Sequence, residues 1–171
     1  KTYEGATGLK TGSTSLALYN LSASATRNNL SLIAVVMRAP TPKDRVANAR
    51  TLLDYGFANY EYISTSEQGK IVQNIPVSKG IQKDLNLVYS SSTGCAVNKG
   101  NSKKITTEIK INDNIEAPIT KGDILGKVNF YLDEKIIATS NLIAQNDIKK
   151  MNTFNMFEYV TNLWSNLNRN K

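Results

Sequence analysis

An ammonium group, a hydroxyl group and a glycine stand next to one another in Lys10-Thr11-Gly12, inside the run from Gly8 to Thr14. An ammonium group attracts anions, a threonine hydroxyl donates hydrogen bonds, and a glycine lets another chain approach the backbone closely. In a regular strand, Lys10 and Thr11 point to opposite faces, so both reach one ligand only at a sheet edge or at a twist. What such a surface would bind depends on the residues around it.

The chain of 171 residues has no histidine, and Cys95 is its single cysteine. These counts exclude Ser-His-Asp and Cys-His catalysis, most zinc sites and any internal disulfide. Reactive thiols need an exposed, electropositive setting, whereas Cys95 lies in the small, weakly polar run Thr93 to Val97. We therefore interpret Cys95 as a small buried residue, and we expect no metal and no cofactor.

The formal net charge of +7 fits either solubility or attraction to an anionic surface, such as lipid headgroups or a cell-wall polymer. Nucleic acid is not an expected partner, because the lysines are scattered and no nucleic-acid-binding motif is present. No run of eighteen apolar residues occurs, so no segment is expected to span a bilayer as a helix.

Two adjacent strands are predicted over residues 16–27 and 30–37, with Asn28-Asn29 as the turn between them, because asparagine tolerates positive φ. The second strand is nearly apolar on both faces, which is typical of a strand in the middle of a covered sheet. Lys10-Thr11-Gly12 is expected on or next to the first strand.

A helix is predicted after the strands, with Thr41 as its cap, Pro42 in its first turn and Asp44 near its positive end. Gly56 marks its expected end, to within a turn. One helix covers only one face of the strands, so this part is expected to be incomplete by itself. The apolar residues at helical spacing are Val46, Ala49, Leu52, Leu53 and Phe57.

Short alternating runs follow a polar connector at residues 64–70, where we place a domain boundary. Several short strands separated by turn residues predict a small all-β sandwich or barrel, and its scattered acidic residues indicate a solvated strand face. The predicted strands are 71–77, 85–89, 104–111, 126–132 and 135–140, the last two forming a hairpin about Asp133-Glu134.

The tail from Met151 to Asn168 is predicted to be a helix whose apolar and aromatic residues cover somewhat more than half of its circumference, flanked by lysines and an arginine. Such a helix fits a membrane interface, and it equally fits packing on a sheet or on another subunit. The residues expected to touch a membrane in the first case are Phe154, Phe157, Val160, Trp164 and Leu167.

The runs Gly8 to Gly12, Tyr19 to Arg27 and Leu32 to Met37 resemble the D-alanyl-D-alanine carboxypeptidases, the low-molecular-mass penicillin-binding proteins. Lys-Thr-Gly opening a strand is the third signature of penicillin-reactive serine enzymes. The segments Ala117 to Asp123 and Leu125 to Val128 look like the β-rich domain that follows the peptidase domain in this family.

The resemblance implies an α+β chain. Its expected parts are the C-terminal strands and helix of a penicillin-binding-protein/β-lactamase-like peptidase domain (1–63), a small all-β sandwich domain (64–146) and a C-terminal amphipathic helix (147–171). It also implies a place on the outer face of the bacterial cytoplasmic membrane, because these enzymes typically anchor there by such a helix.

In the family, a serine attacks the terminal D-Ala-D-Ala bond of the peptidoglycan stem peptide, and penicillin and other β-lactams are trapped as acyl-enzymes. A lysine acts near the serine, which fits a chain without histidine. The resemblance implies that Lys10 and Thr11 contact the substrate carboxylate and that the substrate backbone approaches Gly12. Arg45 matches an arginine that the family uses near this carboxylate; as an alternative, it is a surface arginine that pairs along the helix.

The family's other two signatures, Ser-x-x-Lys and Ser-x-Asn, are absent from this sequence. They are expected N-terminal to Lys10, so the chain is expected to be the C-terminal part of an enzyme and inactive alone. Three residues depart from the family pattern. Ser13 stands where a bulkier residue is common, and Leu18 and Arg38 each stand where glycine is usual.

Two other interpretations stay open. A non-enzymatic module would use the β domain and tail for partner binding or as a spacer from the membrane. A β-lactamase would share the motif, although such enzymes end soon after the corresponding strands. The uncovered strands also predict that residues 8–58 form a dimer or lack fixed structure.

Overall fold

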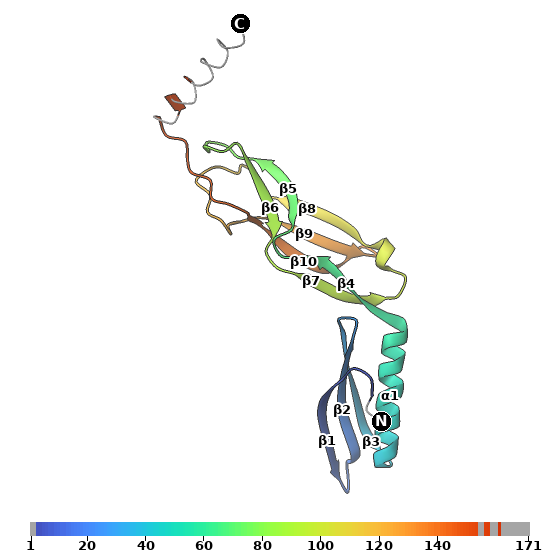
Figure 1. Ribbon diagram of the computed structural model, residues 1–171. Helices are drawn as coiled ribbons and strands as arrows, with labels where there is room; N and C mark the ends of the chain where they lie inside the picture. Colours follow the sequence, from blue (N-terminus) through green and yellow to red (C-terminus); the bar gives the residue numbers. More distant parts are fainter. Residues whose placement is uncertain (1–2, 154–155, 158–160, 162–171) are drawn as a thin grey trace. The chain divides into compact units, whose positions relative to one another are not determined.

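The structure is a computed structural model, and it describes residues 3–153, 156–157 and 161 (Figure 1). The chain separates into two compact units. The first contains Lys1–Ile63 and Gly94–Lys104, and the second contains Ser64–Thr93 and Ile105–Lys171. The segment Gly94–Lys104 thus belongs to the first unit, although it lies in the middle of the residues expected to form the β domain.

The first unit contains a three-stranded antiparallel sheet in the order β1-β2-β3. Its strands are β1 (Ala6–Thr14), β2 (Leu18–Arg27) and β3 (Leu30–Ala39). The predicted turn between β2 and β3 is confirmed, with φ of 48° at Asn28 and 64° at Asn29. Lys10-Thr11-Gly12 lies within β1. The prediction that β3 is a central strand is wrong for the described residues, since β3 forms an edge of this sheet.

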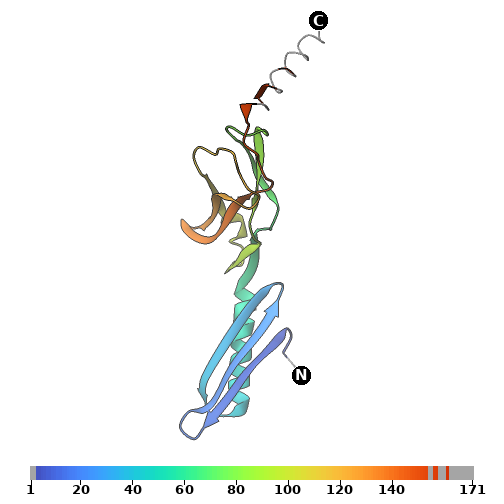
Figure 2. The ribbon, with the colours of Figure 1, turned by 90° about the vertical axis from the view of Figure 1, so that its left-hand side faces the viewer.

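Helix α1 (Pro42–Asn59) packs on one face of the sheet (Figure 2). The predicted cap is confirmed: the Thr41 hydroxyl accepts a hydrogen bond from the Asp44 backbone N–H at 3.1 Å. Contact with the sheet runs along Ala49, Leu53 and Gly56, which are buried and spaced four and three residues apart.

The apolar stripe predicted for the helix is only partly buried. Val46 and Leu52 of the apolar stripe are each 50% exposed, because the buried row at Ala49, Leu53 and Gly56 is narrower than the stripe. Helix α1 ends at Asn59, within one turn of Gly56 as predicted, and a Cβ atom at Gly56 would lie 2.5 Å from Leu32 Cδ1. The glycine therefore permits close packing of the helix on the sheet.

The other face of this sheet is uncovered in the described part of the chain. Ile33, Val35 and Met37 on β3 are 70%, 60% and 77% exposed. Their neighbours Ala34 and Val36 face the core on the side of α1. Within the described residues, one helix covers one face of this sheet, as the sequence predicts.

Strands β4 (Tyr60–Ser66) and β7 (Thr93–Asn98) form a two-stranded sheet. The predicted connector at 64–70 is therefore wrong for its first three residues. Their polar side chains are typical of a connector, but here serine and threonine form hydrogen bonds between the two strands. The buried Ser66 hydroxyl accepts a hydrogen bond from the Thr93 backbone N–H at 3.0 Å. A short 3₁₀ helix, η1 (Ser102–Lys104), follows β7.

The second unit contains a five-stranded antiparallel sheet in the order β5-β6-β10-β9-β8. The predicted strands are all present with shifted ends, and Asp133 and Glu134 form the turn at φ of 47° and 63°. Leu87, Val128 and Leu142 are fully buried on one face, which residues Ala117–Ile119 and Ile148 close over. The strands are β5 (Ile71–Pro76), β6 (Asp84–Tyr89), β8 (Thr106–Ile111), β9 (Ile124–Leu132) and β10 (Lys135–Ala144).

Candidate functional site

The strand register separates Lys10 from Thr11. Lys10 pairs with Ser22, whose partner on β3 is the exposed Val35. Thr11 pairs with Leu21, which packs in the core between the sheet and α1. Thr11 therefore lies in the row facing the helix and Lys10 in the row on the uncovered face, as regular alternation predicts.

The Lys10 ammonium group turns back toward the strand backbone. Its Nζ donates a hydrogen bond to the Thr11 carbonyl oxygen at 2.6 Å, and the residue is exposed. Lys10 forms no ion pair with a carboxylate in the described part of the chain. Since β1 is an edge strand, this positive charge is open to an anion that approaches the edge.

Gly12 is surrounded by open space. A Cβ atom built there has no neighbour within 4 Å, and its φ lies outside the left-handed region. The local fold thus does not require glycine at this position. An absent side chain leaves room for another backbone beside β1.

Arg45 lies in the first turn of α1, on the face that meets β2. Its guanidinium carbon is 5.7 Å from the centre of the Tyr19 ring, within the range of a cation–π contact. Its Nε atom is buried without a hydrogen-bond partner among the described residues. Tyr19 pairs with Ser13 near the end of β1, so Arg45 shares the helix-facing side with Thr11, whereas Lys10 does not.

A bulge on β3 shapes the same end of the sheet. Between Val36 and Ala39, β3 carries one residue more than β2, and Asn20 on β2 accepts a hydrogen bond from the Arg38 backbone N–H at 2.9 Å. Arg38 has φ of 55° and Leu18 has φ of 50°. Both residues that replace a usual family glycine therefore adopt the left-handed backbone that glycine tolerates best. The sequence analysis did not predict this bulge. The residues that could have indicated it are Leu18 and Arg38, which stand where glycine is usual.

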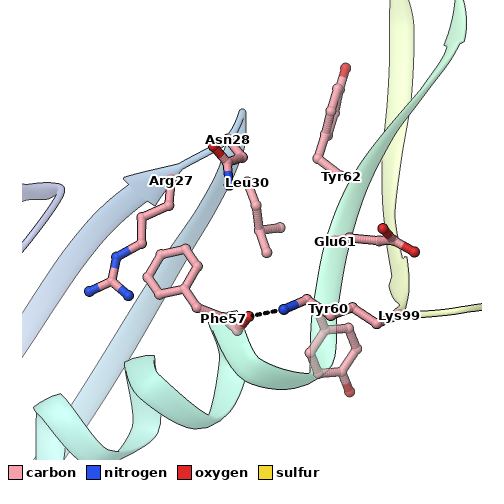
Figure 3. Close-up of a pocket in the computed structure, with 8 residues that line it drawn as sticks. All are labelled: Arg27, Asn28, Leu30, Phe57, Tyr60, Glu61, Tyr62 and Lys99. Atoms are coloured by element: carbon pink, nitrogen blue, oxygen red, sulfur yellow. Dashed lines mark hydrogen bonds between the residues drawn. The ribbon is translucent and has the colours of Figure 1, made fainter.

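A hollow of about 410 Å³ lies elsewhere in the first unit, near the turn between β2 and β3 (Figure 3). The Arg27 guanidinium lies 4.6 Å from the centre of the Phe57 ring, and Lys99 Nζ donates to the Phe57 carbonyl oxygen at 2.7 Å. These cations are engaged within the unit, and none of the predicted site residues lines the hollow. We therefore interpret this hollow as a gap between packed elements and not as a binding site.

Cys95 is half-buried, and burial raises the pKa of its thiol. A raised pKa lowers the thiolate fraction and with it the reactivity. Within the described residues, no group of three or more acidic or cysteine side chains is arranged to hold a metal ion.

The tail prediction falls mostly outside the described residues. Phe154, Val160, Trp164 and Leu167 lie there, and the described Phe157 is 72% exposed. In the part of the chain that the structure describes, no helix has the length and apolar character needed to cross a membrane.

Comparison with known proteins matches two parts of the chain. Residues 60–150 match the model of the penicillin-binding protein 5 C-terminal domain, and residues 1–41 match that of D-alanyl-D-alanine carboxypeptidase. The chain belongs to the penicillin-binding protein 5 family of D-alanyl-D-alanine carboxypeptidases. The first match alone covers more than half of its residues.

Individual members of this family are similar along most of the chain. The carboxypeptidase DacA of Haemophilus influenzae is 40% identical over 86% of this chain, and DacF of Bacillus subtilis is 40% identical over 88%. A crystal structure of penicillin-binding protein 5 from H. influenzae superposes with a TM-score of 0.74 at 39% identity, covering 86% of this chain and 43% of that one. The chain spans 38% and 39% of the length of the two curated relatives.

Proposed function

We propose that this chain is part of a serine-type D-Ala-D-Ala carboxypeptidase that removes the terminal D-alanine from peptidoglycan stem pentapeptides and is acylated by penicillin. The observation that carries the proposal is the Lys-Thr-Gly run on an edge strand, with an exposed ammonium group that forms no ion pair among the described residues and with open space at Gly12. The relatives named carboxypeptidases support the same reaction. The 171 residues contain neither Ser-x-x-Lys nor Ser-x-Asn, so the proposed acylation needs a serine outside this chain.

In this proposal, β1 binds the C-terminal end of the substrate. The Lys10 ammonium and the Thr11 hydroxyl hold the terminal carboxylate, and the substrate backbone lies along the strand at Gly12. Arg45 adds a second positive charge from the helix side. Lys10 and Thr11 lie in opposite rows, so a shared ligand must sit at the edge of β1, where the Lys10 side chain already turns back toward the backbone.

Intact mass after incubation with penicillin tests the proposal directly. We expect an adduct on the full-length carboxypeptidase that contains this chain and none on the 171-residue chain. An adduct on the isolated chain would mean that one of its own serines is the nucleophile. No adduct on either protein would favour the alternative, a non-enzymatic β-domain module for partner binding or spacing.

The role of β1 is tested by Gly12→Ala and Lys10→Ala in the full-length enzyme. The alanine methyl group at position 12 meets open space within the chain, so folding stability should change by less than about 0.5 kcal/mol. The acylation rate should fall at least about tenfold in each variant, because a strand-edge contact or the carboxylate charge is lost. An unchanged acylation rate in both variants would show that β1 does not bind the substrate.

We further propose that the tail lies on the outer face of the cytoplasmic membrane. The exposed Phe157 and the net charge of +7 support an interfacial helix. Binding of the chain to anionic vesicles should weaken in Phe157→Ser and Trp164→Ser. Full binding by a chain ending at residue 150 would contradict this role.

A dimer through residues 8–58 is a further proposal, supported by the uncovered apolar face of β3. Association with a second protein surface is favourable here, because it removes this apolar surface from water.

A further inference from the structure

Three amide side chains of the second unit, from β5, from β6 and from the residue after β10, are joined in a row by hydrogen bonds. Asn74 on β5 donates from Nδ2 to Asn86 Oδ1 on β6 at 2.8 Å, and Asn86 Nδ2 donates to Gln145 Oε1 at 3.0 Å. Asn74 and Asn86 are directly paired across the two strands. Each amide is thereby fixed in one orientation, and the row ends in an Asn74 carbonyl and a Gln145 amino group that can bond to a ligand.

The amide row borders a hollow of about 270 Å³. Asn146, Gln82 and Asp84 also line it, and Asp147 adds a carboxylate whose Oδ1 accepts from the Lys121 backbone N–H at 2.6 Å. Among the described residues, no lysine or arginine lines this hollow. The two carboxylates disfavour an anionic ligand, and the many amide groups suit a neutral ligand that both donates and accepts hydrogen bonds.

A second hollow, of about 480 Å³, is lined by residues that neighbour those of the first. Gln145 and Lys121 line it, and these residues bond to Asn86 and Asp147 of the first hollow. Its apolar lining includes the partly exposed Ile143, which pairs across to the buried Val88 of β6. Amide groups and an apolar side chain thus line neighbouring hollows.

We propose that the two hollows form one groove that binds a glycan strand carrying N-acetyl groups. Sugar hydroxyl and acetamido groups donate and accept hydrogen bonds as the amide row requires, and the apolar face of a ring suits the partly exposed Ile143. Asn74 lies on β5, an edge strand of this sheet, so a peptide could pair with the free side of β5, and peptide binding is one of the outcomes that the test distinguishes. The choice of glycan rests on the proposed function, since peptidoglycan joins such strands to the stem peptides.

Titration of the 171-residue chain with the tetramer of N-acetylglucosamine, followed by ¹H–¹⁵N NMR, tests the groove. Side-chain amide signals of Asn74, Asn86, Gln145 and Asn146 should shift saturably at millimolar tetramer. Affinity should fall at least about tenfold in Asn74→Ala/Asn146→Ala, whose side chains are exposed and removable without disturbing the core. Asn141→Ala, which removes an exposed amide of β10 outside the groove, should bind as the wild type does.

Three results would overturn the proposal: no saturable shift with the tetramer, equal binding by the double variant, or preferential binding of a stem peptide by the same residues. The readout involves neither acylation nor hydrolysis. Failure of the carboxypeptidase proposal would appear as a missing penicillin adduct on the full-length protein, whereas failure of the groove would appear only in this titration.

Discussion

Two serines of the second unit are equally buried and differ in their hydrogen bonds. Ser66 is 4% exposed, and its hydroxyl donates to the Ser91 carbonyl oxygen at 2.9 Å and accepts from the Thr93 N–H. Ser140 is 3% exposed, and its hydroxyl has no partner among the described residues. A buried polar group costs free energy when it is unpaired and stabilises the fold when it is paired.

The same substitution should therefore act in opposite directions at these positions. We expect Ser66→Ala to lower the free energy of unfolding by about 1–2 kcal/mol and Ser140→Ala to raise it by about 1 kcal/mol. Urea denaturation of both variants against the wild type measures the difference. Loss of stability in Ser140→Ala would show that this hydroxyl has a partner, such as an ordered water molecule.

Glu108 on β8 has a pKa below its ordinary value of 4.5, mainly because the Tyr131 hydroxyl donates to its carboxylate at 2.6 Å. A depressed carboxyl pKa means that the charged form is favoured in the folded state. Its contribution to stability is present above the unfolded-state pKa and is lost as the pH falls through the folded-state pKa. In Tyr131→Phe, the Glu108 pKa measured by NMR titration should rise toward 4.5. An unchanged pKa would assign the effect to Lys110 and Asn129 instead.

Among the elements, the β4–β7 pair depends on a glycine. A Cβ atom at Gly94 would collide with the Tyr62 hydroxyl and ring carbon, and it would lie 2.5 Å from the Ile63 carbonyl oxygen. Backbone cannot move aside as a flexible side chain can, so Gly94→Ala should destabilise the chain by about 2 kcal/mol. Thermal unfolding measures the loss, with Gly12→Ala as the control because its Cβ meets open space. Equal melting temperatures would contradict the packing described.

The bulge of β3 predicts a gain of stability. Arg38 holds a left-handed backbone at φ of 55°, which costs a non-glycine residue about 1 kcal/mol. Arg38→Gly should recover part of this cost, reduced by the greater freedom of glycine in the unfolded chain. Chemical denaturation should show a gain of about 0.5 kcal/mol, and Leu18→Gly, at φ of 50°, should behave alike. A loss in both variants would mean that these side chains make stabilising contacts.

At the scale of the whole molecule, the most unusual feature is the exposed apolar face of β3, because a globular protein normally buries such a surface. Three apolar side chains on one strand are more than half exposed. Burying each against another surface contributes about 1.5–3 kcal/mol, which is enough to drive association. We therefore expect the isolated chain to dimerise at micromolar concentration.

Ile33→Thr/Val35→Thr tests the dimer while keeping β-branched residues that suit a strand. Sedimentation should show a dimer for the wild type and a monomer for this variant. Val46→Thr, which removes a half-exposed apolar group from α1, should leave the dimer intact. A monomeric wild-type chain would contradict the proposed dimer.

The sequence by itself determined the features that depend on neighbouring residues. The Asn28-Asn29 and Asp133-Glu134 turns, the Thr41 cap and the alternating strands were all predictable, because turn chemistry and side-chain alternation act over a few positions. The family was also visible, through the Lys-Thr-Gly run and its surroundings. The strand β4 was missed, because its polar residues resemble a connector until the partner strand β7 is known.

Only the tertiary structure decided which distant residues meet. It placed Arg45 beside Tyr19 and apart from Lys10, assigned Gly94–Lys104 to the first unit, and brought Asn74, Asn86 and Gln145 into one row. These outcomes depend on strand register and sheet order. A shift of one residue in register would turn every side chain of a strand to its other face, and spacing along the chain does not encode that choice.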